Sequence, residues 1–293
     1  MPSLKEVRTR ISSVMSTQQI TKAMKMVAAA KLRRAQDRII QIRPYVDKLN
    51  EILNNVSQVI DELANDYSVQ RPVDRVLLVV VTSDKGLCGA FNSNVFKRTI
   101  SLIKDKYEDV KKGGNLHILP IGKRSYEYFK KRDYTIIDGY WELFSDLSFE
   151  NVKKAAEFVM ESYKEEEYDA VSLIYNEFKN VTAQILRVDP FLPLQYDEPT
   201  TTHAPVHVDY IFEPDKEYIT NTLIPQALKI RFLKALLESN ASEQGARMTA
   251  MDQATENAGE MLKQLRLDFN RSRQASITKE ILEIVGGAEA LAD

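Results

Sequence analysis

The segment of this 293-residue sequence with the most suggestive chemistry is the turn after its first strongly apolar run. The turn reads KGLCG at 85–89 and places the Cys88 thiol three residues after the Lys85 ammonium group. A neighbouring cation lowers the pKa of a thiol and so favours the reactive thiolate. A lone thiol in a turn is more often packed or part of an interface, and neither a GxSxG motif nor a Cys–His nucleophile pair accompanies it. We therefore predict no catalytic nucleophile here.

The sequence also gives little support for a phosphate-binding site or a metal site. Gly86 and Gly89 do not complete GxGxxG, and the sequence lacks GxxxxGK followed by Ser or Thr. A tight strand-to-helix turn is the simpler interpretation of 85–89. The three histidines, His117, His203 and His207, are scattered, and a pair four residues apart in a predicted loop is weak evidence for zinc. The sequence predicts neither a cofactor nor a metal site.

The clearest structural element in the sequence is a long helix near the C-terminus, which is indicated by a heptad pattern. Apolar or small residues recur there in alternating steps of four and three, which is the seam of a coiled coil. The seam positions are Leu223, Ala227, Ile230, Lys234, Leu237, Ala241, Gln244, Met248, Met251, Thr255, Ala258, Leu262, Leu265, Phe269 and Ser272. One narrow apolar stripe needs a partner helix in water. A static scaffold and a moving or docking shaft both fit this pattern.

The N-terminal segment follows the same spacing and is the predicted partner. Its seam positions are Leu4, Val7, Ile11, Val14, Gln18, Thr21, Lys25, Ala28, Leu32, Ala35, Ile39 and Ile42. Ser3 and Glu6 suit a capping box, and Pro44 predicts a break or kink. After Thr222, Pro225 predicts that a short helix ends and the long one restarts. Paired antiparallel, the C-terminal helix should extend about 25 Å beyond its partner.

The segment between the two helices alternates strands and helices. Continuous β-branched and apolar residues at Val76–Val81 are typical of a strand buried on both faces. Further strands are predicted at 116–121, 134–137, 170–178, 182–188 and 208–212. Helices are predicted at 91–107, with Asn92 or Ser93 as the cap, and at 124–131 and 149–166. This alternation indicates an open, Rossmann-like α/β sheet.

The predicted fold class is therefore α/β with long helices. An antiparallel coiled coil of the N- and C-terminal helices, 1–65 and 214–293, accompanies a central Rossmann-like α/β domain at 66–213. A protein of this length allows one domain with an extended element.

Charge is distributed unevenly, although the chain carries a net charge of −2. Through Arg43 there are ten basic residues against two acidic ones, Glu6 and Asp37. A basic helix favours an anionic partner such as nucleic acid, a membrane or an acidic protein. A single cysteine excludes an intrachain disulfide and favours a reducing compartment. No signal peptide is visible, and no apolar run reaches the ~20 residues of a membrane span.

Three motifs together resemble the gamma subunit of bacterial F-type ATP synthase. They are ITKAMKMVAAAKL at 20–32, SDKGLCG at 83–89, and a C-terminal run that starts with ASEQGARM at 241–248 and reaches RQASIT at 273–278. The resemblance covers the whole chain in order. It implies a rotating central stalk that turns inside three alpha and three beta subunits and is driven by protons or sodium ions. It also implies that nucleotide sites belong to the alpha and beta subunits, so this chain would not itself be an enzyme.

The resemblance further implies contact residues for those partners. Met24 would meet the beta lever loops, and Lys85 and Cys88 would lie in a turn that approaches a beta subunit. In the run RQASIT, Arg273 and Gln274 would meet a beta catch loop, with Thr278 just beyond. Within that run the contact residues are Arg273, Gln274 and Thr278. The central α/β domain, which would form the foot of the stalk, would bind the epsilon subunit and the c-ring near Tyr210.

The implied location is the cytoplasmic face of the bacterial inner membrane, where the chain is peripheral and held through the c-ring alone. The chloroplast branch carries an inserted cysteine pair, which is missing here, and no transit peptide is visible. Two other classes remain as alternatives. The first is a basic coiled-coil protein that binds nucleic acid, in contrast to the rotor, for which no nucleic-acid partner is expected. The second is an α/β nucleotide-binding enzyme with a helical extension.

Overall fold

The computed structural model describes residues 3–62, 66–194 and 216–289. Two compact units are present: unit 1 combines Met1–Ala28 with Met248–Asp293, and unit 2 is Ala29–Arg247. Two long helices, α1 (Leu4–Glu62) and α6 (Lys216–Glu289), each contribute to both units. The mixed α/β fold with long terminal helices is the predicted class.

Unit 2 contains a five-stranded sheet in the order β3-β2-β1-β4-β5. The strands are β1 (Val76–Val81), β2 (Leu116–Ile121), β3 (Thr135–Ile136), β4 (Ala170–Phe178) and β5 (Gln184–Leu192). The first four run parallel, and β5 pairs antiparallel with β4. All six side chains of β1 are buried, as expected for a central strand with helices on both faces.

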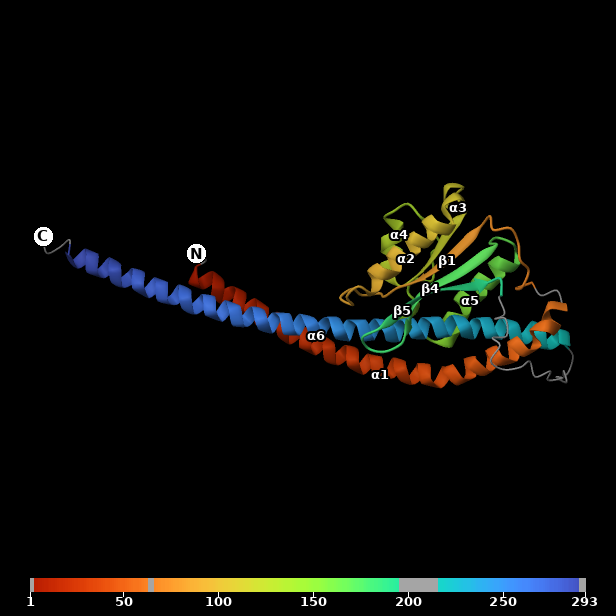
Figure 1. Cartoon of the computed structure of the whole chain (residues 1–293), viewed down its shortest axis with the longest axis horizontal. Coiled ribbons are helices and arrows are strands. Elements are labelled where there is room, and N and C mark those ends of the chain that lie inside the picture. Colours follow the sequence, from red (N-terminus) through yellow and green to blue (C-terminus); the bar gives the residue numbers. More distant parts are fainter. Residues whose placement is uncertain (1–2, 63–65, 195–215, 290–293) are drawn as a thin grey trace. The chain divides into compact units, whose positions relative to one another are not determined.

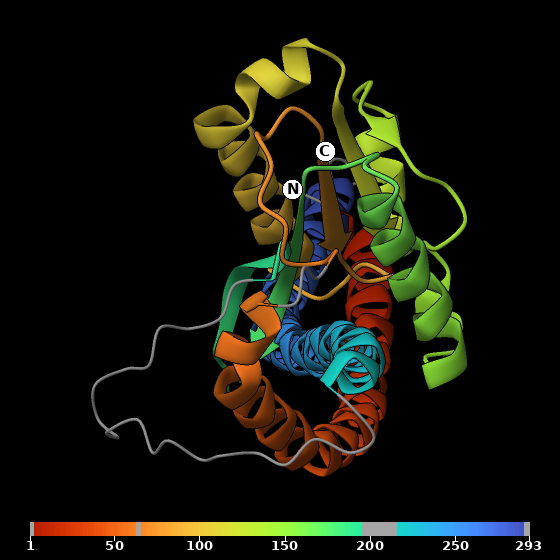
Figure 2. The same cartoon turned by 90° about the vertical axis from the view of Figure 1, so that its right-hand side faces the viewer.

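Helices cover both faces of the sheet (Figures 1 and 2). One face carries α2 (Phe91–Lys106), α3 (Glu108–Lys112) and α4 (Lys123–Lys130), and the opposite face carries α5 (Phe149–Lys164). Each face of the sheet has its own hydrophobic core, and alternate residues of β1 point into one or the other. Val76, Leu78 and Val80 pack on the side of α2 and α4, whereas Leu77 and Val79 pack on the side of α5.

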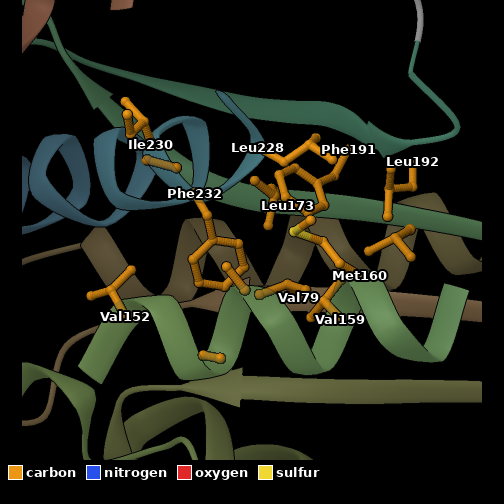
Figure 3. Close-up of a cluster of buried hydrophobic side chains, with 14 of the residues drawn as sticks. Val79, Val152, Val159, Met160, Leu173, Phe191, Leu192, Leu228, Ile230 and Phe232 are labelled. Carbon is orange, nitrogen blue, oxygen red and sulfur yellow. The ribbon is translucent and has the colours of Figure 1, made fainter. Parts of the chain in front are cut away.

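The first half of α6 is a core helix of unit 2. Figure 3 shows Phe232 of α6 directed toward α5, close to the labelled valines of that helix, and Phe232 is fully buried. Leu228 and Leu236 join the same cluster, to which α1 adds Val46, Leu49 and Leu53. Burial on nearly all sides is the behaviour of an interior helix rather than of an amphipathic one.

Polar contacts fix α1, β4 and α6 together within unit 2. Arg43 of α1 donates hydrogen bonds to both carboxylate oxygens of Glu238 on α6, at 2.9–3.1 Å. Arg43 also donates to the carbonyl of Phe178, and the Phe178 N–H donates to Glu238. Because Glu238 is 1% exposed, these bonds replace its lost hydration.

Unit 1 is an antiparallel helix pair. The Lys25 ammonium lies 2.5 Å from Asp252, and the Gln18 side chain donates to the Thr255 carbonyl. The residue number therefore increases along α1 as that of its contact in α6 decreases, which shows that the helices are antiparallel. The Thr21 and Thr255 hydroxyl oxygens lie 2.8 Å apart at a polar layer in the seam. Every predicted seam position in both helices is buried or half-buried, which confirms the 4-3 pattern.

The strands predicted from the sequence agree with the structure in part. Val76–Val81, Leu116–Ile121 and Ala170–Phe178 begin and end where predicted. The strand predicted at 182–188 is instead β5, which includes Pro190; an edge strand tolerates proline because one side needs no N–H. The strand predicted at 208–212 lies outside the described residues.

The predicted restart of the C-terminal helix at Pro225 is wrong, and of the break or kink predicted at Pro44 the break is wrong. Both α1 and α6 continue through Pro44 and Pro225. A helical proline frees the carbonyl four residues earlier. Those carbonyls belong to Ile40 and Asn221, which are exposed, so water can satisfy them.

The helix caps were predicted with mixed success. The Glu6 N–H donates to the Ser3 hydroxyl at 3.2 Å, which confirms the N-cap part of the predicted box. The predicted Asn92 or Ser93 cap of α2 is wrong, because Ala90 is the cap residue. The Asn92 side chain instead bonds Ser83 and lies 3.3 Å from the Cys88 sulfur.

Candidate functional site

The sheet reverses its strand order between β1 and β4, the place where open α/β sheets commonly bind ligands. The segment after β1, residues 82–90, lies at this switch point. Its polar groups satisfy the N-terminus of α4: the N–H groups of Lys123, Arg124 and Ser125 donate to Asp84, Ser83 and Thr82 respectively. A helix N-terminus whose donors are occupied offers no phosphate cradle.

Within this loop the predicted contact residues have opposite exposures. Lys85 is exposed, whereas Cys88 is 2% exposed and packs against Ser83 and Asn92. Burial raises the pKa of the Cys88 thiol, more than the attraction of Arg247 and the hydrogen bonds lower it. The thiol is therefore packed within the turn, the alternative that the sequence favoured over activation by Lys85. Leu87, in a left-handed conformation with φ 63°, is 65% exposed at the loop tip.

The loop is anchored to α6 by Arg247. Its guanidinium donates to the carbonyls of Lys85 and Gly86 and also pairs with Glu243, one turn earlier. Burial raises the pKa of Glu243, and the Arg247 charge opposes that shift. One arginine thus couples a loop that presents Lys85 and Leu87 to the helix that runs through the core of unit 2.

In unit 1, Met24 is half-buried beside the helix seam. The residues around it on the outer surface of α1 are apolar and exposed: Ile20, Met26 and Val27 are 56–61% exposed. The same helix carries the basic residues, and Lys5, Arg8 and Lys22 have no ion pair within the described residues. An outer surface that is both apolar and cationic suits an acidic protein partner.

Also in unit 1, α6 continues past the N-terminal end of α1 (Figure 1). Arg273 and Gln274 are exposed at the start of this single-helix stretch, and within the described part of the chain their side chains have neither an ion pair nor a hydrogen bond. Thr278, one turn later, is exposed and donates its hydroxyl to the Gln274 carbonyl. From Ile277 onward, five large apolar residues are 49–70% exposed: Ile277, Ile281, Leu282, Ile284 and Val285.

The structure groups the remaining predicted residues by unit. Met24, Arg273, Gln274 and Thr278 belong to unit 1, and Lys85 and Cys88 belong to unit 2. Tyr210, together with His203 and His207, lies outside the described residues. Among the helices that are described, none is long and apolar enough to cross a membrane.

Comparison with known proteins decides the family. The family model described as ATP synthase matches residues 3–291. The chain is 57% identical to the ATP synthase gamma chain of Cytophaga hutchinsonii, and the match covers 99% of both sequences. It belongs to the ATP synthase gamma chain family. A second gamma chain, from Amoebophilus asiaticus, is 50% identical over 99% of each chain.

Solved structures support the gamma chain fold. A chain from the Tetrahymena thermophila mitochondrial ATP synthase central stalk and c-ring structure has a TM-score of 0.57 at 28% identity, covering 80% of this chain and 99% of that one. A chain from the Euglena gracilis mitochondrial ATP synthase has a TM-score of 0.69 at 21% identity, covering 98% and 94%. Both of these chains therefore share the fold of this gamma chain.

Sequence reasoning missed three features of this gamma chain. The role of Arg247 was hidden, because its carbonyl partners lie about 160 residues away along the chain. Leu87 and the exposed apolar residues around Met24 also escaped notice. Helical spacing gives a partial signal for the latter, since Ile20 and Val27 lie off the predicted seam.

Proposed function

We propose that this gamma chain is the rotor of a bacterial F-type ATP synthase and couples rotation of the c-ring, driven by protons or sodium ions, to conformational change in the beta subunits. Three alpha and three beta subunits would surround unit 1. The catalytic and nucleotide sites would lie on those subunits, so this chain would contribute no catalytic group.

One observation carries this proposal: in unit 1 a helix pair gives way to a single helix whose apolar side chains are exposed. A lone helix with Ile281, Leu282 and Ile284 in water exposes far more apolar surface than a soluble element normally does. A surrounding collar of other subunits would bury those side chains while the helix turned within it. A static two-helix scaffold gives no reason for this exposed end.

The contact residues divide between two levels in this proposal. Met24 and the exposed apolar residues beside it would meet beta subunits along the pair, and Arg273, Gln274 and Thr278 would meet a beta subunit where α6 continues alone. The loop that carries Lys85 would approach a beta subunit, with Leu87 beside it. Cys88 would act only by packing that loop, because its thiol is buried.

The foot would supply the membrane-side contacts. We propose that the central domain, in the region of Tyr210, binds the epsilon subunit and the c-ring. The chain would then be held at the cytoplasmic face of the inner membrane through the c-ring.

Replacement of Arg273 and Gln274 by Ala in the assembled complex tests the coupling role. An arginine can hold a carboxylate in two parallel hydrogen bonds, and a glutamine adds a donor and an acceptor. Charge-assisted bonds of this kind contribute about 1.5–3 kcal/mol each, enough to bias one beta conformation and weak enough to release at each step. We expect ATP hydrolysis and ion-driven ATP synthesis in membrane vesicles to fall about tenfold or more.

The matched control is Asn270→Ala with Arg271→Ala, which removes the same two kinds of side chain from exposed positions one turn earlier. Both double variants should assemble, because Ala favours the helix. Unchanged hydrolysis and synthesis in Arg273→Ala/Gln274→Ala would reject the directional contact, and an equal loss in both variants would reject its specificity.

A further inference from the structure

A depression of about 390 Å³ lies beside α2, against strands β4 and β5, within unit 2. Its rim is formed by Asn94, Lys97, Arg98 and Ser101 of α2, and its opposite wall by Gln184 of β5. The volume lies within the range of small-ligand sites. This depression is separate from the loop 82–90 and from every contact residue proposed above.

The floor contains an unsatisfied donor. Asn176 of β4 lines the depression and is 4% exposed, yet its Nδ2 has no hydrogen-bond partner among the described residues. A buried amide N–H without an acceptor destabilises the fold and therefore calls for an explanation. An acceptor atom that reached the floor of the depression would complete that bond.

The rim is positively charged and uncompensated. Lys97 and Arg98 are exposed and form no ion pair with any described residue. The Ser101 hydroxyl donates to Asp105, the nearest acidic partner on the same helix. Within α2, the helix that forms this rim, four Lys and Arg residues outnumber one acidic residue, Asp105. This local field favours an anion.

The remaining wall is apolar. Phe91, which is 4% exposed, and Leu186, which is half-buried, both line the depression. A site with cations at its rim, amide groups at its floor and wall, and an aromatic ring beside them matches an organic anion better than a bare inorganic ion.

We propose that this depression binds a small organic anion that carries a phosphate or carboxylate group. Lys97 and Arg98 neutralise the charge, Asn176 donates to an anion oxygen, and Phe91 and Leu186 contact the organic part. Because the ligand bridges α2 and the β4–β5 hairpin, its binding stabilises unit 2.

Titration of the full-length chain with phenyl phosphate, benzoate and benzyl alcohol tests this site, with calorimetry and thermal unfolding as readouts. The three probes share a ring and differ in the group attached to it. We expect the anions to bind with Kd near or below about 1 mM and to raise the unfolding temperature, and the neutral alcohol to do neither. The stronger anion identifies phosphate or carboxylate as the natural group.

Three variants make the test specific. The double variant Lys97→Ala/Arg98→Ala should weaken anion binding about tenfold or more, whereas Lys104→Ala, an exposed charge on the same helix outside the depression, should leave it unchanged. Asn176→Leu should abolish binding while keeping the fold, because it removes the unpaired amide. The proposal is overturned if neither anion binds at about 10 mM, ten times the expected Kd, or if benzyl alcohol binds as tightly as the anions. It is also overturned if the double variant and Lys104→Ala bind the anions with equal affinity.

Discussion

At the residue scale, Gly122 shows how one backbone position holds the switch-point loop. It has φ 100° and ψ 139°, a region that is essentially restricted to glycine. A Cβ atom there would lie 2.2 Å from the Thr82 carbonyl oxygen, which is backbone and cannot rotate away. Thr82 in turn accepts from the Ser125 N–H, so the glycine and the threonine jointly place α4.

We therefore expect Gly122→Ala to destabilise unit 2 by about 2–4 kcal/mol, because conformational strain and a backbone clash add together. Urea unfolding followed by the fluorescence of Trp141 measures it, since the Trp141 carbonyl accepts from the Gly122 N–H. Gly139→Ala is the control: its φ is also positive, at 112°, but open space surrounds the new Cβ. Equal losses in both variants would show that the close approach to Thr82 contributes nothing.

Cys88 supports a second prediction at this scale. Because the thiol is buried and its pKa is raised, it remains protonated at neutral pH and reacts slowly. ATPase activity of the assembled complex should therefore be the same with and without dithiothreitol. A reversible several-fold change that disappears in Cys88→Ser would contradict this expectation.

At the element scale, the contact between Arg43 and Glu238 joins three elements that are distant in sequence. Glu238→Ala would leave the Phe178 N–H without its acceptor and remove the carboxylate that Arg43 binds. Arg43 has a side chain that is 42% exposed and can turn to water, so the expected loss is about 2–4 kcal/mol rather than the full cost of a stranded buried charge.

Urea unfolding of Glu238→Ala, Arg43→Ala and the double variant measures the coupling between these residues. Glu127→Ala breaks the exposed pair with Arg124 in the same unit and should change stability by less than about 1 kcal/mol. Additive losses for Arg43 and Glu238 would show that the pair is not coupled.

Periodicity could predict the long helices because burial at the seam depends on local spacing alone. Leu32, Ala35 and Ile39 are buried as the heptad pattern requires. The same pattern could not show that 223–247 is a core helix, because residues off the seam, such as Ser239 and Ser242, are polar yet fully buried. Their burial depends on a sheet built from residues far away along the chain.

The candidate site was predictable only where it was carried by a motif. Lys85 and Arg273 were identified through the family resemblance and are exposed, as a contact would need. The depression beside α2 was invisible in the sequence, since Lys97, Asn176 and Gln184 meet only after β4 and β5 have paired beside α2. Alternation of strands and helices could predict that sheet, but not which side chains would share one wall.

At the scale of the whole molecule, the chain should not bind nucleotide tightly by itself. The N-terminus of α4 is occupied by the loop at the switch point, and Arg247 closes that loop against α6. Calorimetric titration of the full-length chain with Mg-ATP should show no micromolar binding. Weak binding that disappears in Lys97→Ala/Arg98→Ala would belong to the anion depression, whereas saturable micromolar binding in that variant would contradict this account.

The edge strand β5 affects how readily the newly made chain aggregates before it assembles with other subunits. An uncovered edge invites the strands of neighbouring molecules to pair with it and aggregate. Pro190 lacks the N–H that such pairing needs, the Arg187–Glu177 ion pair places charges along the edge, and the Pro190 carbonyl already accepts from Arg231. A newly made chain is therefore protected along β5, whereas the apolar end of α6 presents a hazard of self-association. That end is the surface which a chaperone or the first partner subunit must cover soonest.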